Sequence, residues 1–283
     1  MCHNSRSGDI NVKIEKQVNS CYLCMIQYST ISKSGASMIY DFWKDYEELL
    51  SYEQASLLDY RLDNIAIKLN TFFQRLIIAP IKKSEITFYL AGSCIKADTF
   101  RDLDMFFPSN EDRELLNGAM NQDYFEYENN SYTYRYKNDI YQLVYRERFQ
   151  GASLKELVDG FDFDSTKIAF ECTYNTRKRL FTIVKCDMRM EFVNYINTRV
   201  NHLSKVSINP FVSLQRAIYF LKRGDDVPYE VFLQVCSKIV DLNVEQSDDT
   251  SVYFKNLQGN PNKLTNIKEA IAHYIEEQKK SHH

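Results

Sequence analysis

The stretch from residue 86 to residue 107, ITFYLAGSCIKADTFRDLDMFF, constrains this chain more than any other. It opens with an apolar run rich in β-branched and aromatic residues, which is typical of a buried strand. The run breaks at Gly92 and Ser93, and a second apolar segment then carries Asp102 and Asp104. Because side chains alternate across a strand, these two carboxylates share one face, about 6.6 Å apart along it. Carboxylates placed so closely repel each other, and a divalent cation between them, Mg²⁺ or Mn²⁺, is the simplest explanation.

The turn between the two segments indicates a phosphate site. Gly92 permits a close approach of backbone to phosphate, and Ser93 can begin a short helix whose amides attract anions. This arrangement resembles the nucleotidyltransferase superfamily that includes DNA polymerase β. The resemblance implies that Asp102 and Asp104 hold the metal ion and are catalytic, while Gly92 and Ser93 seat the triphosphate of an NTP. The alternative is a surface hairpin whose polar face happens to carry two aspartates.

The same resemblance assigns roles to three further residues. Lys96 and Arg101 lie in the short spacer between the turn and the Asp-x-Asp segment, where they could neutralise the triphosphate. The next predicted strand, residues 140–145, is where many members of the superfamily carry a third carboxylate. Here the candidate position holds Gln142, a neutral amide, so a second metal ion is expected to bind weakly.

A later segment resembles a motif of CCA-adding enzymes and bacterial poly(A) polymerases. Asp162-Phe163 match its Asp-Phe, while Gly160-Phe161 stand in place of its two arginines. The motif lines the nucleotide site in that family, which implies a ribose or triphosphate contact for Asp162. The alternative is a helix cap, in which the carboxylate of Asp162 or Asp164 accepts from backbone amides.

The segment from Asn209 to Gly224 is similar to the one that follows in the same enzymes. It predicts an amphipathic helix on which Arg216 either faces phosphate or is solvated. The order of these motifs also resembles a group of phage-encoded predicted nucleotidyltransferases, in which a strand containing glutamine precedes Phe-Asp-Phe, as Gln142 does here.

These patterns predict an α+β fold, with a small mixed nucleotidyltransferase sheet backed by helices, a helical N-terminal extension and a helical C-terminal region. The expected domains are residues 1–80, 81–200 and 201–283. Helices are predicted within 37–78 and over 111–119, 229–241 and 262–279, together with a hairpin around Asn129-Asn130 and a helix, turn and second helix over 151–175.

Composition limits the remaining choices. A net charge of −3 and a pI near 6.0 argue against a strongly electrostatic nucleic-acid binder. No apolar run reaches membrane-spanning length, and seven scattered cysteines fit reduced thiols, so a cytoplasmic protein is expected, in a host cell if phage-encoded. Cys21-x-x-Cys24 could ligate zinc, although buried free cysteines are favoured. The aromatic and basic residues of 132–137 could stack bases, but a charged edge strand is favoured.

The predicted reaction is transfer of a nucleoside monophosphate from an NTP to a hydroxyl, with an RNA or tRNA 3′ end favoured as acceptor. A protein side-chain hydroxyl is the second possibility. A binding module for nucleotide or RNA without turnover is the non-enzymatic alternative, because Gln142 replaces an acid. The oligomeric state is left open.

Overall fold

The computed structural model describes residues 40–92, 94–97, 100, 102–128, 131–207 and 209–241. The chain forms two compact units, Met1–Lys44 and Asp45–His283. Of the first unit, residues 40–44 are described, and they begin the 3₁₀ helix η2 (Asp41–Tyr46). The predicted Cys21–Cys24 pair and the helix over 262–279 lie outside the described residues.

A seven-stranded mixed sheet forms the centre of the second unit, in the order β3-β4-β5-β2-β1-β6-β7. Its strands are β1 (Glu85–Ala91), β2 (Asp102–Phe106), β3 (Phe125–Glu128), β4 (Ser131–Tyr136), β5 (Asp139–Val144), β6 (Ile168–Asn175) and β7 (Leu180–Met188). Strands β2 and β5 run parallel, and every other neighbouring pair is antiparallel. The predicted α+β fold with a mixed sheet and helices toward both ends is therefore confirmed.

The long helix α2 (Tyr52–Leu76) packs against one face of the sheet. It begins at a capping box, in which Ser51 accepts from the backbone of Gln54 while the Gln54 side chain accepts from the Ser51 amide. Its apolar stripe ends in two adjacent aromatic residues that reach the strands. Phe72 stacks on Tyr141 of β5 with 3.9 Å between ring centroids. A shorter helix, α3 (Asn110–Ala119), follows β2 as predicted.

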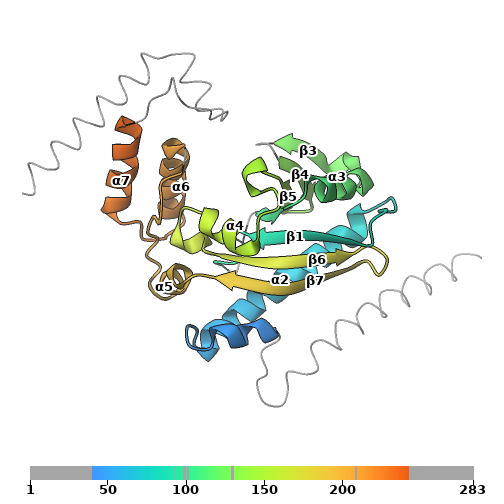
Figure 1. Cartoon of the computed structure of the whole chain (residues 1–283), viewed down its shortest axis with the longest axis horizontal. Helices are drawn as coiled ribbons and strands as arrows, with labels where there is room; N and C mark the ends of the chain where they lie inside the picture. Colours follow the sequence, from blue (N-terminus) through green and yellow to red (C-terminus); the bar gives the residue numbers. More distant parts are fainter. Residues whose placement is uncertain are drawn as a thin grey trace, which may run out of the picture. The chain divides into compact units, whose positions relative to one another are not determined.

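The opposite face of the sheet is covered over β1 and β6 by the short helix α4 (Leu154–Gly160) (Figure 1). Leu157 and Val158 of this helix pack against Ala91 and Ala169, which face each other in neighbouring strands. Alanine side chains on the sheet let the helix approach closely. Because side chains alternate along β2, Asp102 and Asp104 lie on this second face, away from buried Leu103.

Helices dominate the C-terminal part of the described chain. They are η5 (Asp164–Thr166), α5 (Met190–Thr198), α6 (Pro210–Lys222) and α7 (Tyr229–Val240). Two further 3₁₀ turns, η3 (Gln122–Tyr124) and η4 (Glu147–Phe149), lie earlier in the chain. Helices α6 and α7 lie side by side (Figure 1) and share a core that includes Phe220 and Val235. Phe163 joins this core with its ring 5.0 Å from that of Phe220, and thereby ties the segment before β6 to α6.

Two sequence predictions of helices are wrong. The second helix expected within 151–175 is instead strand β6, which pairs with β1 over seven residue pairs and with β7 on its other side. From Phe170 to Asn175 this strand alternates buried apolar residues with half-buried polar ones, so the period of two that marks a strand was present in the sequence and was misread. Residues 94–97 form a turn and bends where a short helix was expected after Ser93. Strand β7 and helix α5 were not predicted.

The other helices and strands predicted on described residues are confirmed, and so is the hairpin. Strands β3 and β4 pair as the arms of the hairpin expected around Asn129-Asn130, although those two residues lie outside the described part. Tyr134 of this hairpin is fully buried and donates to Asn117 of α3. The charged edge strand favoured for 132–137 is wrong, because β4 lies between β3 and β5 in the sheet. The division into domains at residues 80 and 200 stays a prediction.

Candidate active site

Strand β2 and the turn that follows β1 bring Gly92 against Asp104. Ala91, the last residue of β1, pairs in register with Asp104, so the turn begins beside this carboxylate. Gly92 has a φ of +92°, and a Cβ built at this position would lie 3.0 Å from Oδ2 of Asp104. The left-handed backbone and the close approach both require glycine here. The Gly-Ser turn and the Asp-x-Asp strand, predicted from sequence to act together, are therefore neighbours in space at Gly92 and Asp104.

The start of the loop after Gly92 stays close to both aspartates. Cys94 is buried, and its thiol donates to the carbonyl of Ala91 at 3.6 Å. Burial raises the pKa of the Cys94 thiol, and the negative charges of Asp104 and Asp102 raise it further. Both carboxylates are therefore close enough to this loop for their charges to raise the pKa of the Cys94 thiol. Ser93 and Arg101, the other residues expected to contact phosphate, lie outside the described residues.

A polar row extends from Asp104 across the neighbouring strands. Asp104 pairs in register with Gln142 of β5, and Gln142 pairs with Thr133 of β4, so the three side chains share one face. Nε2 of Gln142 donates to Oγ1 of Thr133 at 3.4 Å. Gln142 thus stands beside Asp104, where the sequence comparison expected a third acid. In the part of the chain that the structure describes, no three His, Cys, Asp or Glu side chains gather to hold a metal ion.

Two cations that the sequence analysis missed follow β5 directly. Partial burial and the positive charge of Arg148 lower the pKa of Arg146, whereas the carboxylate of Asp104 acts in the opposite direction. Burial and the charge of Arg216 lower the pKa of Arg148, which also feels the charge of Asp162. The available signal was Arg-x-Arg immediately after the strand that carries Gln142.

Asp162 is buried and forms an ion pair with the half-exposed Arg216, and it does not lie at a helix start. Its Oδ1 accepts from Arg216 at 2.7 Å and its Oδ2 accepts from the Ser213 hydroxyl at 3.1 Å, so it fastens the segment before η5 to α6. The residue at the start of η5 is Phe163, with no side-chain cap, so the cap alternative for Asp162 is wrong. Arg216 is about half exposed and paired with Asp162, so it is not simply solvated.

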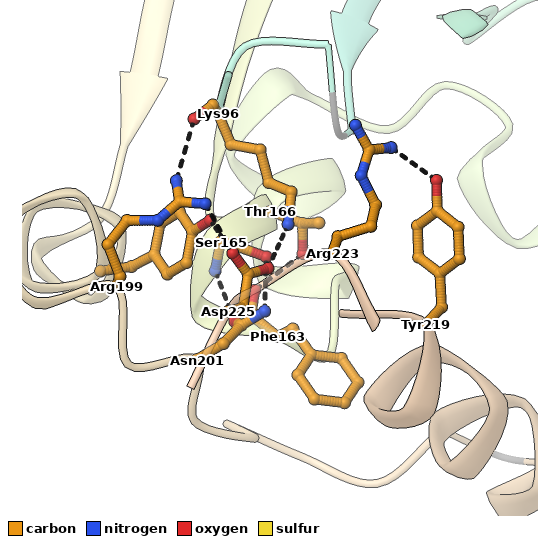
Figure 2. A network of polar contacts seen from close by, with 10 residues as sticks. Lys96, Phe163, Ser165, Thr166, Arg199, Asn201, Tyr219, Arg223 and Asp225 are labelled. Carbon is orange, nitrogen blue, oxygen red and sulfur yellow. Dashed lines mark hydrogen bonds and ion pairs between the residues drawn. The ribbon is translucent and has the colours of Figure 1, made fainter. Parts of the chain in front are cut away.

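Lys96, expected to neutralise phosphate, is instead fully buried in a network shown in Figure 2. Its amine pairs with Asp225 and lies 4.2 Å from the centroid of the Phe220 ring. Asp225 also accepts from the Tyr195 hydroxyl and from Arg199, each at 2.8 Å. Burial lowers the pKa of Lys96, although Asp225 acts in the opposite direction. Lys96 therefore anchors the loop that follows Gly92 and does not point to solvent.

The donor set on β2 fits a magnesium ion that is shared with a substrate. Asp102 and Asp104 are both half-buried and offer hard oxygen ligands on one face. The absence of a side chain at Gly92 leaves room beside Oδ2 of Asp104. Mg²⁺ is usually held by one or two carboxylates, with water and substrate phosphates completing its octahedron, so two aspartates are sufficient.

No family model matches this sequence, and no curated protein matches it. Among solved structures, the chain is similar to a Thermotoga maritima CCA-adding enzyme in complex with tRNA, at 12% identity and a TM-score of 0.42, over 68% of this chain and 47% of that one. It is also similar to a CCA-adding enzyme in complex with ATP, at 13% identity and a TM-score of 0.43, over 68% of this chain and 46% of that one. The chain thus spans slightly less than half the length of these structures. No described helix is both long and apolar enough to cross a membrane.

Proposed function

We propose that this protein is a metal-dependent nucleotidyltransferase, which moves a nucleoside monophosphate from an NTP to a hydroxyl and releases pyrophosphate. One observation carries the proposal: a glycine turn with positive φ lies against the carboxylate of Asp104, on the strand that also presents Asp102. A phosphate that enters beside Gly92 meets backbone without a side chain in the way, next to two oxygen ligands for its counter-ion.

The roles of the residues follow from their positions. Asp102 and Asp104 would hold the divalent cation, and the turn at Gly92 and Ser93 would seat the triphosphate. When bound, the cation supplies charge stabilisation for the phosphates in the transition state. Asp162 stays a candidate for a ribose contact, since each of its oxygens keeps a second lone pair beyond the bonds from Arg216 and Ser213.

In the transfer itself, the acceptor oxygen forms a bond to the α-phosphorus as the bond from that phosphorus to the bridging oxygen breaks. Pyrophosphate leaves with the bonding electron pair, and the proton of the acceptor hydroxyl passes to solvent. An RNA 3′ end is the acceptor we propose. Support comes from the resemblance of the motifs around Asp102 and Asp162 to those of CCA-adding enzymes, as given above.

The test uses each of the four α-labelled NTPs with Mg²⁺ or Mn²⁺, total RNA and, in a separate arm, lysate protein. Label is expected on RNA with the wild-type chain. Asp104→Asn, which keeps the size of the side chain, is expected to reduce labelling by about 100-fold or more, because several kcal/mol of charge stabilisation depend on the ligand. Asp123→Asn removes an exposed carboxylate from η3 and is the matched control, expected to label like the wild type.

The other outcomes separate the alternatives. Label on a protein band that disappears with Asp104→Asn would show that the acceptor is a protein and not RNA. Absence of label from every arm, with a folded chain whose melting temperature rises with NTP and Mg²⁺, indicates a binding module. Full activity of a folded Asp104→Asn variant contradicts the proposed mechanism.

A further inference from the structure

Position 142 bears on how many cations the proposed active site can hold. The second cation of a two-metal site needs anionic ligands to offset its charge. Gln142 occupies the position on β5 beside Asp104, and its amide already donates to Thr133, which leaves a single neutral carbonyl oxygen as ligand. A neutral oxygen offsets no positive charge, so a second cation would bind here more weakly than beside a carboxylate at position 142.

Arg146 supplies a positive charge close to the same carboxylate. Arg146 follows the end of β5, the strand parallel to β2, by two residues. It is close enough to Asp104 for the negative charge of that carboxylate to act on the guanidinium. Arg148 differs, because the charges that act on it are those of Arg216 and Asp162. Of the two arginines, Arg146 is therefore the one that lies near Asp104.

A comparison of charges shows that one arrangement can replace the other. Three carboxylates with two divalent cations leave one net positive charge to face the triphosphate. Two carboxylates, one guanidinium and one divalent cation leave the same net charge. The loss of an acid at position 142 and the presence of Arg146 thus compensate each other, provided that one metal ion is absent.

We propose, building on the nucleotidyltransferase function above, that this site takes the NTP with a single divalent cation held by Asp102 and Asp104, and that Arg146 contacts the triphosphate in place of a second one. Guanidinium groups bind phosphate oxygens through paired N–H donors, so the replacement also fixes the geometry of the phosphates.

The experiment counts metal ions without relying on turnover. The folded full-length chain is dialysed to equilibrium with Mn²⁺ and the α,β-methylene analogue of ATP, and in parallel with that of CTP, and bound Mn²⁺ and bound nucleotide are both measured. The wild type is expected to bind one Mn²⁺ per bound nucleotide. Gln142→Glu restores the third acid and is expected to bind two.

Arg146 is tested in the same assay. Arg146→Gln is expected to weaken nucleotide binding by about tenfold or more, since a charge-assisted hydrogen bond is lost. Arg146→Lys should recover part of that affinity and covers the case in which the glutamine variant folds poorly. Arg135→Gln, which removes an exposed arginine paired with Glu126 on the neighbouring hairpin, is the matched control and should bind as the wild type does.

The outcomes distinguish this inference from the function on which it rests. Two Mn²⁺ per nucleotide in the wild type, or unchanged nucleotide affinity in both Arg146 variants, overturns the single-cation arrangement and leaves the nucleotidyltransferase proposal intact. Binding of neither Mn²⁺ nor nucleotide overturns both.

Discussion

The charge of Asp225 is expected to contribute more to stability than any exposed ion pair of the described chain. The side chain of Asp225 is 0% exposed and that of Lys96 is 2% exposed, so the two charges meet away from water. Asp225→Asn keeps the shape and can still accept from Tyr195, but it leaves the amine of Lys96 without a compensating anion. Breaking a buried pair in this way costs about 3–5 kcal/mol.

The two partners of this pair should respond unequally. Lys96→Met leaves Asp225 its bonds from Arg199, which is 45% exposed, and from Tyr195, so the loss should be smaller than for Asp225→Asn. The amine of Lys96 lies 4.2 Å from the centroid of the Phe220 ring and 5.4 Å from that of Tyr195, and an unbranched methionine can occupy the same space beside the two rings. Adding Lys96→Met to Asp225→Asn should therefore restore part of the lost stability, because the unpaired charge is gone.

Urea unfolding followed by circular dichroism measures the free energy of unfolding of each variant. Arg135→Gln is the control: it breaks a pair whose side chains are 45% and 57% exposed, and it should cost no more than about 1 kcal/mol. A loss below about 1 kcal/mol in Asp225→Asn, or a double variant less stable than Asp225→Asn alone, would refute this account of the network.

Two further predictions concern single residues. Gly92→Ala is expected to destabilise the chain by about 1–2 kcal/mol through its φ of +92° and to abolish labelling through contact with Asp104, whereas Gly118→Ala, with open space in helix α3, should be neutral or stabilising; thermal unfolding and the labelling assay check both. Burial raises the pKa of Asp164 above its usual 3.8, so the folded state keeps this carboxyl protonated to a higher pH than the unfolded state does. The free energy of unfolding therefore falls as the pH rises from about 3.8 through the folded pKa. Asp164→Asn removes that titration, so its stability relative to the wild type should increase over the same pH range in urea unfolding, and an unchanged difference would contradict the assignment.

Local patterns were sufficient to predict that the Gly92 turn, the Asp-x-Asp strand and the strand of Gln142 lie together. The apolar runs around Gly92, the Asp-x-Asp alternation and the strand of Gln142 are all properties of neighbouring residues, and the sheet places them as expected. The misread strand β6 alternates apolar and polar residues from Phe170 to Asn175, so periodicity does predict a strand there. Its place between β1 and β7 depends on pairings across the sheet that local patterns do not contain.

The role of Lys96 could not be read from its surroundings in sequence. A lysine in a polar loop is normally solvated, and its partner Asp225 is 129 residues further along the chain. The same holds for Asp162, whose partner Arg216 is 54 residues away. Lys96 was expected to neutralise the triphosphate and Asp162 to contact the ribose or triphosphate or to cap a helix. Both are fixed by ion pairs that only the folded chain brings together.

The separation in sequence between Lys96 and Asp225 also affects the order in which parts of the chain fold during synthesis. During synthesis from the N-terminus, β1, its turn and β2 exist long before the residue that anchors the loop after Gly92 has been made. An emerging chain therefore presents its two aspartates beside a loop that is not yet fastened, and the anchor can close only once the turn between α6 and α7 has left the ribosome. The loop after Gly92 should thus be among the last parts of the sheet region to become rigid, although it is among the first to be translated.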